Sequence, residues 1–303
     1  MPTADAYSQR LVQAAVQAMQ LEVACGPKPG LVDPFNTGAH QDMDQAAFGR
    51  SIQALEPHLG AYAQAGRKLG IREGSYQKVG LGADQALGAF TQLQSLGLAG
   101  EEASLAANQG VNCHAGLNFA WALILPAAQI LMQWGIKKSF PEDTCRLVGA
   151  LASPAYLAWR QEEGWGRPGG ARLAAAQGYP LVLNPGLVTL RAWTKEDQEP
   201  DRNFLFLVSL VRLMAVNPDS NILRRGGETG LSWVQTRAQN ILRDFQICEG
   251  DDPDTQQLDH LDFLSALKDF DCEMIAQNLS PGGSADLLAL AIFFRLLEFD
   301  FLC

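Results

Sequence analysis

The sequence predicts one all-α domain of 303 residues. Three observations predict this fold class. Apolar residues recur with helical spacing along most of the chain, strand-like runs are rare, and no Gly/Ser linker or charged run divides the sequence. Hydrophobic residues make up 47% of the chain and charged residues 18%, which is the balance of a folded globular protein and not of a disordered one. A chain of this length can bury a sizeable core.

The helical pattern starts near the N-terminus. The apolar side chains that recur there at i, i+3, i+4 and i+7 are Leu11, Ala14, Ala15, Ala18 and Leu21. The same spacing predicts helices over 231–245 and 264–274. Residues 205–216 and 287–297 are apolar nearly all round, which predicts central, buried helices. The best strand-like run, Tyr179–Leu183, is only five residues long.

The stretch from His114 to Ile136 carries no Asp, Glu, Lys or Arg. About 20 apolar residues can span a bilayer, but polar and helix-breaking residues interrupt this stretch: Asn118, Pro126, Gln129, Gln133 and Gly135. We therefore expect a buried helix of a large α-domain here, and no membrane partner.

The chain has 23 Lys and Arg against 33 Asp and Glu, a formal net charge of −10. This excess of acid argues against nucleic acid and against anionic membrane surfaces as partners. A polyanionic ligand would need a few placed cations or a metal ion.

The cysteines are scattered and form no C-x-x-C pair or zinc spacing, so we expect reduced thiols: Cys25, Cys113, Cys145, Cys248, Cys272 and Cys303. The N-terminal residues show no basic and then apolar signal-peptide pattern, and we expect a cytoplasmic protein. The sequence leaves homo-oligomer formation open.

Four segments break the helical pattern and are rich in Gly, Pro, Asn, Asp and His: Gly26–Asp44, Gly110–Gly116, Asn217–Gly227 and Asn278–Asp286. Each runs into a helical pattern. A glycine-bearing loop before a helix leaves backbone N–H groups free at the positive end of the helix dipole, and this arrangement suits phosphate. We expect the four loops to converge on one pocket.

In Gly26–Asp44, the alternation His40, Asp42, Asp44 suits Mg²⁺ ligation or general-base chemistry. The alternative, equally supported, is that Asp42 or Asp44 caps a helix that begins near Gln45. Lys28 lies between two prolines, which favours a phosphate contact over a place inside a helix.

The other three loops have structural alternatives too. Asn112 can be only a helix cap, and a lone His114 is usually structural. Asp219 and Asn221 beside arginines fit a metal–phosphate site, or else a solvated loop. Ser284 can be an N-cap with Asp286 in the first helical turn.

Several runs resemble the triphosphoribosyl-dephospho-CoA synthase family. They are Pro27–Asp33, Asn36–His40, Asp42–Asp44, Gly110–Asn112, Gly178–Pro180, Asn221–Gly227 and Asn278–Leu288. The similarity is collinear from about Glu22 to Leu288, and the last run is long and specific.

The resemblance implies an all-α fold and a pentosyl transfer. Members of this family move the triphosphoribosyl part of ATP onto the 2′-hydroxyl of 3′-dephospho-CoA and release adenine. The product is the precursor of a prosthetic group on acyl-carrier subunits. Such chemistry needs a carboxylate near the anomeric carbon, a base for the hydroxyl, and Mg²⁺ with cations on the triphosphate.

We assign roles to the motif residues on this basis. The catalytic candidates are His40, Asp42, Asp44, Asp219 and Asn221. The candidates for substrate and phosphate binding are Lys28, Asn36, Asn112, His114, Arg225, Gly226, Gly282, Gly283 and Ser284. The candidates for Mg²⁺ ligation are Asp42, Asp44, Asp219 and Asp286. ATP is the expected substrate.

The chain also departs from the family pattern. Gln41 and Ala115 stand where the family usually has lysines, and Leu173–Ala176 replaces a run with two glutamates. Three functions therefore stay open: the synthase reaction, transfer of a (phospho)ribosyl group to another acceptor in a different cofactor pathway, and a catalytically silent nucleotide-binding protein.

Overall fold

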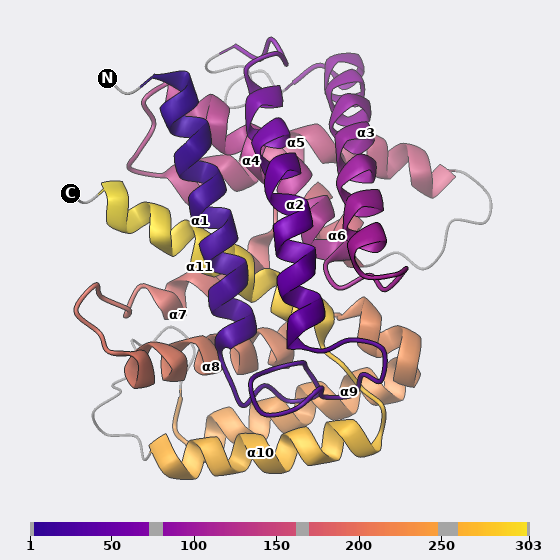
Figure 1. Cartoon of the computed structure of the whole chain (residues 1–303), viewed down its shortest axis with the longest axis vertical. Coiled ribbons are helices and arrows are strands. Elements are labelled where there is room, and N and C mark those ends of the chain that lie inside the picture. The colour runs from indigo at the N-terminus through magenta and orange to yellow at the C-terminus, as the bar shows by residue number, and fades with distance from the viewer. Residues whose placement is uncertain (1–2, 73–80, 162–169, 248–259, 302–303) are drawn as a thin grey trace. The chain divides into compact units, whose positions relative to one another are not determined.

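The structure is a computed structural model that describes residues 3–72, 81–161, 170–247 and 260–301. Every regular element in these residues is helical, which confirms the all-α class (Figure 1). The helices are α1 (Ala4–Ala24), α2 (Gln45–Gly66), α3 (Ala83–Ala107), α4 (Ala115–Gln133), α5 (Phe140–Gln161), α6 (Gly170–Ala176), η2 (Val182–Leu187), α7 (Val188–Leu190), α8 (Glu199–Val216), α9 (Ser220–Asp244), α10 (His260–Ala276) and α11 (Gly282–Phe301).

The chain divides into two compact units. Unit 1 contains residues 1–17 and 50–180, and unit 2 contains residues 18–49 and 181–303. The helices α1 and α2 each contribute residues to both units. The sequence, which has no linker, predicts one domain and gives no sign of this division.

In unit 1, α3, α4 and α5 pack against one another, and α6 packs against α4 and α5. Among the described residues, α4 is the helix long and apolar enough to cross a membrane, and 83% of its apolar window is buried. Gly66 lets α2 approach α4, because a Cβ at this position would lie 2.4 Å from the carbonyl oxygen of Pro126.

In unit 2, α8 and α11 are almost fully buried, as their all-round apolar sequences predict. The helix α8 packs against α9, and α11 packs against α8, α9, η2 and α7. Tyr179–Leu183 is not a strand. It leads into the π-helical turn η2, where Asn184 leaves helical geometry and Pro185 lacks the N–H that a ladder of hydrogen bonds needs.

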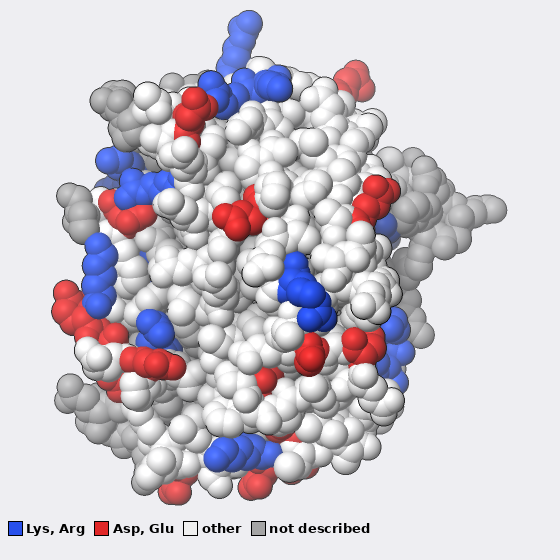
Figure 2. Space-filling model, in the orientation of Figure 1, with Lys and Arg blue, Asp and Glu red and all other residues white. Residues whose placement is uncertain are grey.

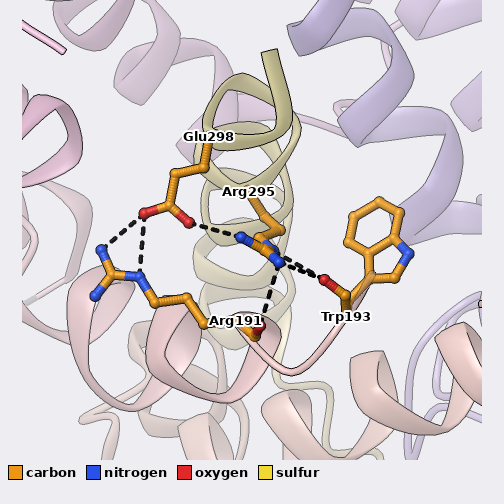
Figure 3. Close-up of polar contacts among 4 residues, drawn as sticks. All are labelled: Arg191, Trp193, Arg295 and Glu298. Atoms are coloured by element: carbon orange, nitrogen blue, oxygen red, sulfur yellow. Dashed lines mark hydrogen bonds and ion pairs between the residues drawn. The ribbon is translucent and has the colours of Figure 1, made fainter. Parts of the chain in front are cut away.

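A buried arginine of α11 fixes the segment that follows α7 (Figure 3). The guanidinium of Arg295 donates from Nε to the carbonyl oxygen of Trp193 (3.1 Å) and from Nη2 to that of Arg191 (3.2 Å). Its Nη1 donates to Oε2 of Glu298 (3.1 Å), whose Oε1 accepts from Nη2 of Arg191 (2.7 Å). The guanidinium therefore satisfies two carbonyl groups that end a short helix without intrahelical partners.

We expect Arg295→Met to lower the free energy of unfolding by about 2 kcal/mol. The substitution keeps an apolar stem but leaves buried carbonyl oxygens without a donor, which costs about 1–3 kcal/mol. Urea unfolding followed by circular dichroism measures this change. The control is Arg243→Met at the exposed end of α9. Equal stability of Arg295→Met and the wild type would contradict the role given to Arg295.

Candidate functional site

The loop between α1 and α2, residues 25–44, is folded around Asp33. One oxygen of its carboxylate accepts a hydrogen bond from the backbone N–H of Lys28 (2.8 Å). The other accepts from the N–H groups of Phe35 (2.7 Å) and Asn36 (3.1 Å). Such local bonds give the backbone partners that no helix or sheet provides here, so the loop has a defined shape.

Two glycines in this loop hold conformations that other residues rarely adopt. Gly30 has φ = +71° and Gly38 has φ = +56°. A Cβ on Gly30 would lie 2.4 Å from the carbonyl oxygen of Leu279, and one on Gly38 would lie 2.6 Å from the backbone of Gly30. Both the backbone angles and the close contacts therefore require glycine.

Asp271 of α10 anchors the same loop. Its carboxylate accepts from the N–H of Gly30 (2.8 Å) and from Nδ2 of Asn36 (2.8 Å), and Oδ1 of Asn36 accepts from the N–H of Gly38 (2.6 Å). Burial raises the pKa of Asp271, and these hydrogen bonds oppose the rise. The side chain of Asn36, a predicted binding residue, thus connects its loop to α10.

Asp219 joins the N-termini of two helices. It is the N-cap of α9: its Oδ1 accepts from the N–H of Asn221 (2.9 Å) and of Ile222 (3.4 Å). Its Oδ2 accepts from both the N–H (2.8 Å) and Oγ (3.1 Å) of Ser284 in α11. The side chain is 1% exposed, and burial raises its pKa while the hydrogen bonds oppose the rise. Both carboxylate oxygens of Asp219 therefore already accept hydrogen bonds from the protein.

Glycines let the start of α11 approach α9. A Cβ on Gly282 would lie 2.7 Å from Nδ2 of Asn221, and one on Gly283 would lie 3.1 Å from Oδ2 of Asp219. Within the described residues, the backbone N–H groups of Gly282 and Gly283 find no acceptor. Two donors at the positive end of a buried helix are therefore available to an anion.

The helix α11 begins at Gly282, three residues earlier than an N-cap at Ser284 would give. Ser284 lies in its first turn and is not the N-cap, and Asp286 lies beyond that turn. Pro281 provides the carbonyl oxygen that accepts from the N–H groups of Ser284 and Ala285. The structural alternative of an N-cap therefore does not hold for Ser284, because it lies inside the helix and its hydroxyl bonds to Asp219.

Asp286 is partly buried, and no described residue hydrogen-bonds to its carboxyl group. Its pKa is raised well above the ordinary value by burial first, and then by the nearby carboxylates of Asp219 and Glu22. A carboxyl group with available oxygens and a raised pKa is typical of an acid or base that acts in catalysis.

Lys28 lies in a buried pair with Glu22. Its Nζ donates to Oε1 of Glu22 (2.5 Å) and to the carbonyl oxygen of the same residue (2.7 Å), and Lys28 is 1% exposed. The structure therefore places this predicted phosphate ligand where two protein oxygens already hold its ammonium group. The adjacent Cys25 is a free thiol whose pKa burial raises to about 12, as expected of a structural cysteine.

Arg225 and His40 connect the loop 25–44 to the start of α9 and to the segment before α11. Nη1 of Arg225 donates to the carbonyl oxygen of Ala39 (2.8 Å) and to Oδ1 of Asn278 (3.0 Å). Its Nη2 donates to Nδ1 of His40 (3.2 Å), and Nε2 of His40 shares a hydrogen bond with Oγ of Ser280 (2.8 Å). Burial and then the Arg225 cation lower the pKa of His40. The tautomer with its proton on Nε2 is compatible with both contacts, because Nδ1 can then accept from Arg225.

The segment Asn217–Gly227 ends with two glycines that its conformation requires. A Cβ on Gly226 would lie 2.6 Å from Cδ2 of Leu279, so Gly226 lets α9 pack against the loop before α11. Gly227 interrupts the helix, with φ = +63°. The residues that the sequence predicts as a loop are thus the first turns of α9, ended by a break at Gly227.

Asp42 and Asp44 do not join the other carboxylates. Asp44 caps α2, since its Oδ1 accepts from the N–H of Ala47 (2.8 Å), which is the structural alternative for this residue. The Asp42 side chain is 62% exposed and lies 3.7 Å from Nδ1 of His40. Among the described residues, no three His, Cys, Asp or Glu side chains are placed to hold a metal ion. The predicted ligand set of Asp42, Asp44, Asp219 and Asp286 is therefore not assembled.

Three of the four loops lie in unit 2 and are joined by hydrogen bonds. The fourth, Gly110–Gly116, belongs to unit 1. There Nδ2 of Asn112 donates to Oε1 of Glu101 (2.7 Å). His114 is the N-cap residue of α4, is buried, and lies with Nδ1 2.7 Å from Oγ of Ser51.

Four residues of the site were not predicted from the sequence. They are Glu22, Asp271, Ser280 and Asn217, whose Nδ2 donates to Oγ of Ser284 (3.0 Å). Glu22 lies four residues after Ala18, and Asp271 four residues after Leu267, so each carboxylate lies on the apolar face of its helix. An acidic side chain on a face that must be buried needs a partner. That signal was present in the sequence.

The model of the ATP:dephospho-CoA triphosphoribosyl transferase family matches residues 8–167 and 158–301. Among curated proteins, the probable 2-(5''-triphosphoribosyl)-3'-dephosphocoenzyme-A synthase of Pectobacterium carotovorum subsp. carotovorum is 37% identical over 92% of this chain and 86% of its own. The similarly named probable synthase of Streptococcus pyogenes serotype M18 is 33% identical over 94% of this chain and 96% of its own. No solved structure matches the chain.

Proposed function

The chain belongs to the ATP:dephospho-CoA triphosphoribosyl transferase family, and from this premise we propose that it transfers the triphosphoribosyl group of ATP to the 2′-hydroxyl of 3′-dephospho-CoA. Adenine is the second product. The reaction takes place in unit 2, where the loop 25–44 and the starts of α9 and α11 meet. The product is the precursor of a prosthetic group derived from coenzyme A, and we expect the protein to act in the cytoplasm.

The transfer breaks one bond and forms one. The bond between C1′ of the ribose and the adenine nitrogen breaks, and its electron pair leaves with the adenine. The 2′-oxygen of 3′-dephospho-CoA forms the new bond to C1′. The hydroxyl proton goes first to a base and then to the departing adenine, so the step needs no other reactant.

Asp286 is the base in this proposal, and its environment is the observation that carries it. Its carboxyl group is partly buried, accepts no hydrogen bond from the described residues, and has a raised pKa. A raised pKa makes a carboxylate a stronger base, and general-base catalysis contributes about 10²–10⁴-fold to a rate. The same negative charge stabilises the oxocarbenium character at C1′.

Asp219 and Glu22 support this role without taking part in bond making. Their carboxylates raise the pKa of Asp286 by like-charge repulsion. The carboxylate of Asp219 accepts five hydrogen bonds and Glu22 pairs with Lys28, so both charges have fixed positions. They are positioning residues in this proposal, and this revises the direct catalytic role that the sequence suggests for Asp219.

The triphosphate binds at the start of α11 and at Arg224. The free N–H groups of Gly282 and Gly283 and the helix dipole favour an anion there. Arg224 is exposed, and its one hydrogen bond to a described residue is a long contact of 3.5 Å with Oδ1 of Asn221. Arg225, by contrast, already donates hydrogen bonds to the loop 25–44. On the face drawn in Figure 2, acidic and basic side chains are interspersed. In this proposal the positive charge for the triphosphate comes from Arg224 and the N-terminus of α11.

Mg²⁺ enters this proposal only as the cation that ATP carries. The described carboxylates do not assemble a site for it, and the two oxygens of Asp219 are committed to hydrogen bonds. Mg²⁺ commonly binds through one or two carboxylates and substrate phosphates, so a metal that arrives with the triphosphate needs no protein cage.

The experiment is an assay of adenine release. Purified protein is incubated with ATP, Mg²⁺ and 3′-dephospho-CoA, and adenine is measured by chromatography. Release that requires 3′-dephospho-CoA supports the proposal. Release with another acceptor supports a divergent transferase, for which the exposed Gln41 and Ala115 in place of family lysines would be the reason. Nucleotide binding without turnover would leave a silent binding protein.

A further inference from the structure

Phe35 is an exposed aromatic side chain on the loop 25–44 of unit 2. It is 66% exposed, and no described residue makes a ring contact with it. Single exposed apolar residues are ordinary on protein surfaces, so exposure alone does not identify a site. Phe35 differs from the others in being aromatic and in lying on a loop. The other exposed large apolar side chains of the described residues are aliphatic and lie on helices: Leu87, Leu98, Leu157, Val216, Leu261 and Ile275.

Hydrogen bonds on both sides of Phe35 hold its backbone in place. The N–H of Phe35 donates to Oδ1 of Asp33 (2.7 Å), and the N–H of Asp33 donates to the carbonyl oxygen of Asn36 (3.1 Å). Pro34 has a φ that its own ring restricts. The side chain of Asn36 is bound in turn to Asp271 of α10 (2.8 Å). The loop therefore holds the ring of Phe35 at a defined place in contact with solvent, although the ring adds nothing to the core.

The same loop reaches the site that we propose for the triphosphate. Phe35 lies four residues before Ala39, and four residues span at most about 14 Å. The carbonyl oxygen of Ala39 accepts from Arg225 (2.8 Å), which adjoins Arg224 in α9. In Figure 1 the loop is the segment that joins α1 to α2, beside α10. An extended nucleoside triphosphate has a comparable length, so one whose phosphates bind at Arg224 can bring its base to Phe35.

The surroundings of the ring suit a base and not a phosphate. The exposed tip of the loop consists of Pro34, Phe35, Asn36 and Thr37, and none of these carries a charge. A flat heterocycle stacks on an aromatic ring through dispersion and through removal of both faces from water. Every base has such a face, so stacking needs no further polar partner in the protein.

We propose that the ring of Phe35 stacks on the adenine base of ATP while the triphosphate binds at the start of α11 and at Arg224. This inference rests on the proposed function, which supplies ATP and the place of its phosphates. It adds a binding residue for the base of the donor and keeps the whole donor nucleotide within unit 2.

The test is isothermal titration of Mg²⁺–ATP into the full-length protein and its variants. Phe35→Leu keeps an apolar side chain and removes the ring, and we expect the Kd for ATP to rise about tenfold, which is within the usual contribution of base stacking. Phe35→Trp keeps a ring and should bind ATP at least as tightly as the wild type. Ile275→Ala is the matched control, since Ile275 is also an exposed apolar residue of unit 2, and its affinity for ATP should not change.

Inorganic tripolyphosphate separates stacking from a general disturbance of the loop. It has no base, so its Kd should be the same in Phe35→Leu and the wild type, and the urea midpoint of Phe35→Leu should also be unchanged. An equal loss of affinity for tripolyphosphate and ATP would overturn the proposal, and so would an unchanged affinity for ATP. A loss of affinity for 3′-dephospho-CoA and not for ATP would contradict the assignment of the base.

The adenine-release assay keeps this inference apart from the proposed function. Binding of ATP that depends on Phe35 in a protein without turnover supports the stacking and contradicts the reaction. Adenine release with an unchanged KM for ATP in Phe35→Leu supports the reaction and contradicts the stacking.

Discussion

Asp286→Asn should reduce the rate of adenine release by about 10²–10⁴-fold, which is the usual contribution of a general base. Asparagine has the same shape as aspartate but cannot accept the hydroxyl proton or carry the negative charge that stabilises the anomeric carbon. We expect the loss in kcat, with smaller effects on KM, since the substituted group acts on the transition state. Chromatographic measurement of adenine at saturating ATP and 3′-dephospho-CoA gives this rate.

The same variant should be more stable than the wild type at neutral pH. The folded protein raises the pKa of Asp286, so between about pH 4 and that raised value the folded state binds more protons than the unfolded state. Stability that depends on this proton is present at low pH and is lost as the pH rises through the raised pKa. The Asp286→Asn variant has no such loss, because the amide that replaces the carboxyl group stays neutral.

Urea unfolding at a series of pH values tests this sign. The two proteins should have similar free energies of unfolding near pH 4, and Asp286→Asn should become the more stable one as the pH increases. Asp269→Asn provides the control, since Asp269 is exposed in the middle of α10. A variant with normal turnover, or one that is less stable at neutral pH, would remove Asp286 from the role of a desolvated base.

Asp219→Ala should lower the free energy of unfolding by about 3 kcal/mol. Loss of the N-cap of α9 costs about 1 kcal/mol. The buried N–H and hydroxyl of Ser284 lose their acceptor as well, which costs a further ~1–3 kcal/mol. Adenine release should be lost too, because the starts of α9 and α11 no longer hold Asp286 and the glycine donors together.

Asp219→Ser separates the two contributions. Serine is a good N-cap and can keep the bond to the start of α9, but its shorter side chain does not also hold Ser284. We expect a loss of about 2 kcal/mol for Asp219→Ser, between that of Asp219→Ala and the wild type. Urea midpoints of the three proteins at pH 7 measure the order. A change below about 0.5 kcal/mol in Asp219→Ala, which is typical of an ordinary surface site, would contradict the role of Asp219 as the connector.

The sequence predicts the fold class and the buried helices well because helical periodicity is a local property. Three helices show this directly. The apolar stretches of the sequence lie in α8 and α11, and the charge-free stretch forms α4. Composition alone was ambiguous at Tyr179–Leu183, where five residues with strand-like composition continue into η2. A run this short has no periodicity of its own, and the packing of its neighbours decides its conformation.

The sequence was sufficient to predict which loops form the candidate site. It was not sufficient to predict the role of each residue in them. The motifs around Asp33, Arg225 and Ser284 do lie together in unit 2. The partners did not follow from spacing: Lys28 pairs with Glu22, and Asp219 bonds to Ser284 from 65 residues away. Whether a carboxylate is a ligand or a cap depends on which donors reach it, and those donors come from other helices.

The sequence by itself determined that this protein is all-α, that its family is the triphosphoribosyl transferases, and which loops carry polar and glycine-rich motifs. These properties depend on local periodicity and on residue identity. Only the tertiary structure decided that three of the loops meet in one unit while Gly110–Gly116 lies in the other. It also decided that the partly buried carboxyl group of Asp286 accepts no hydrogen bond from the described residues. The reason is physical, since hydrogen bonding and desolvation act between residues that are distant in the chain and close in space.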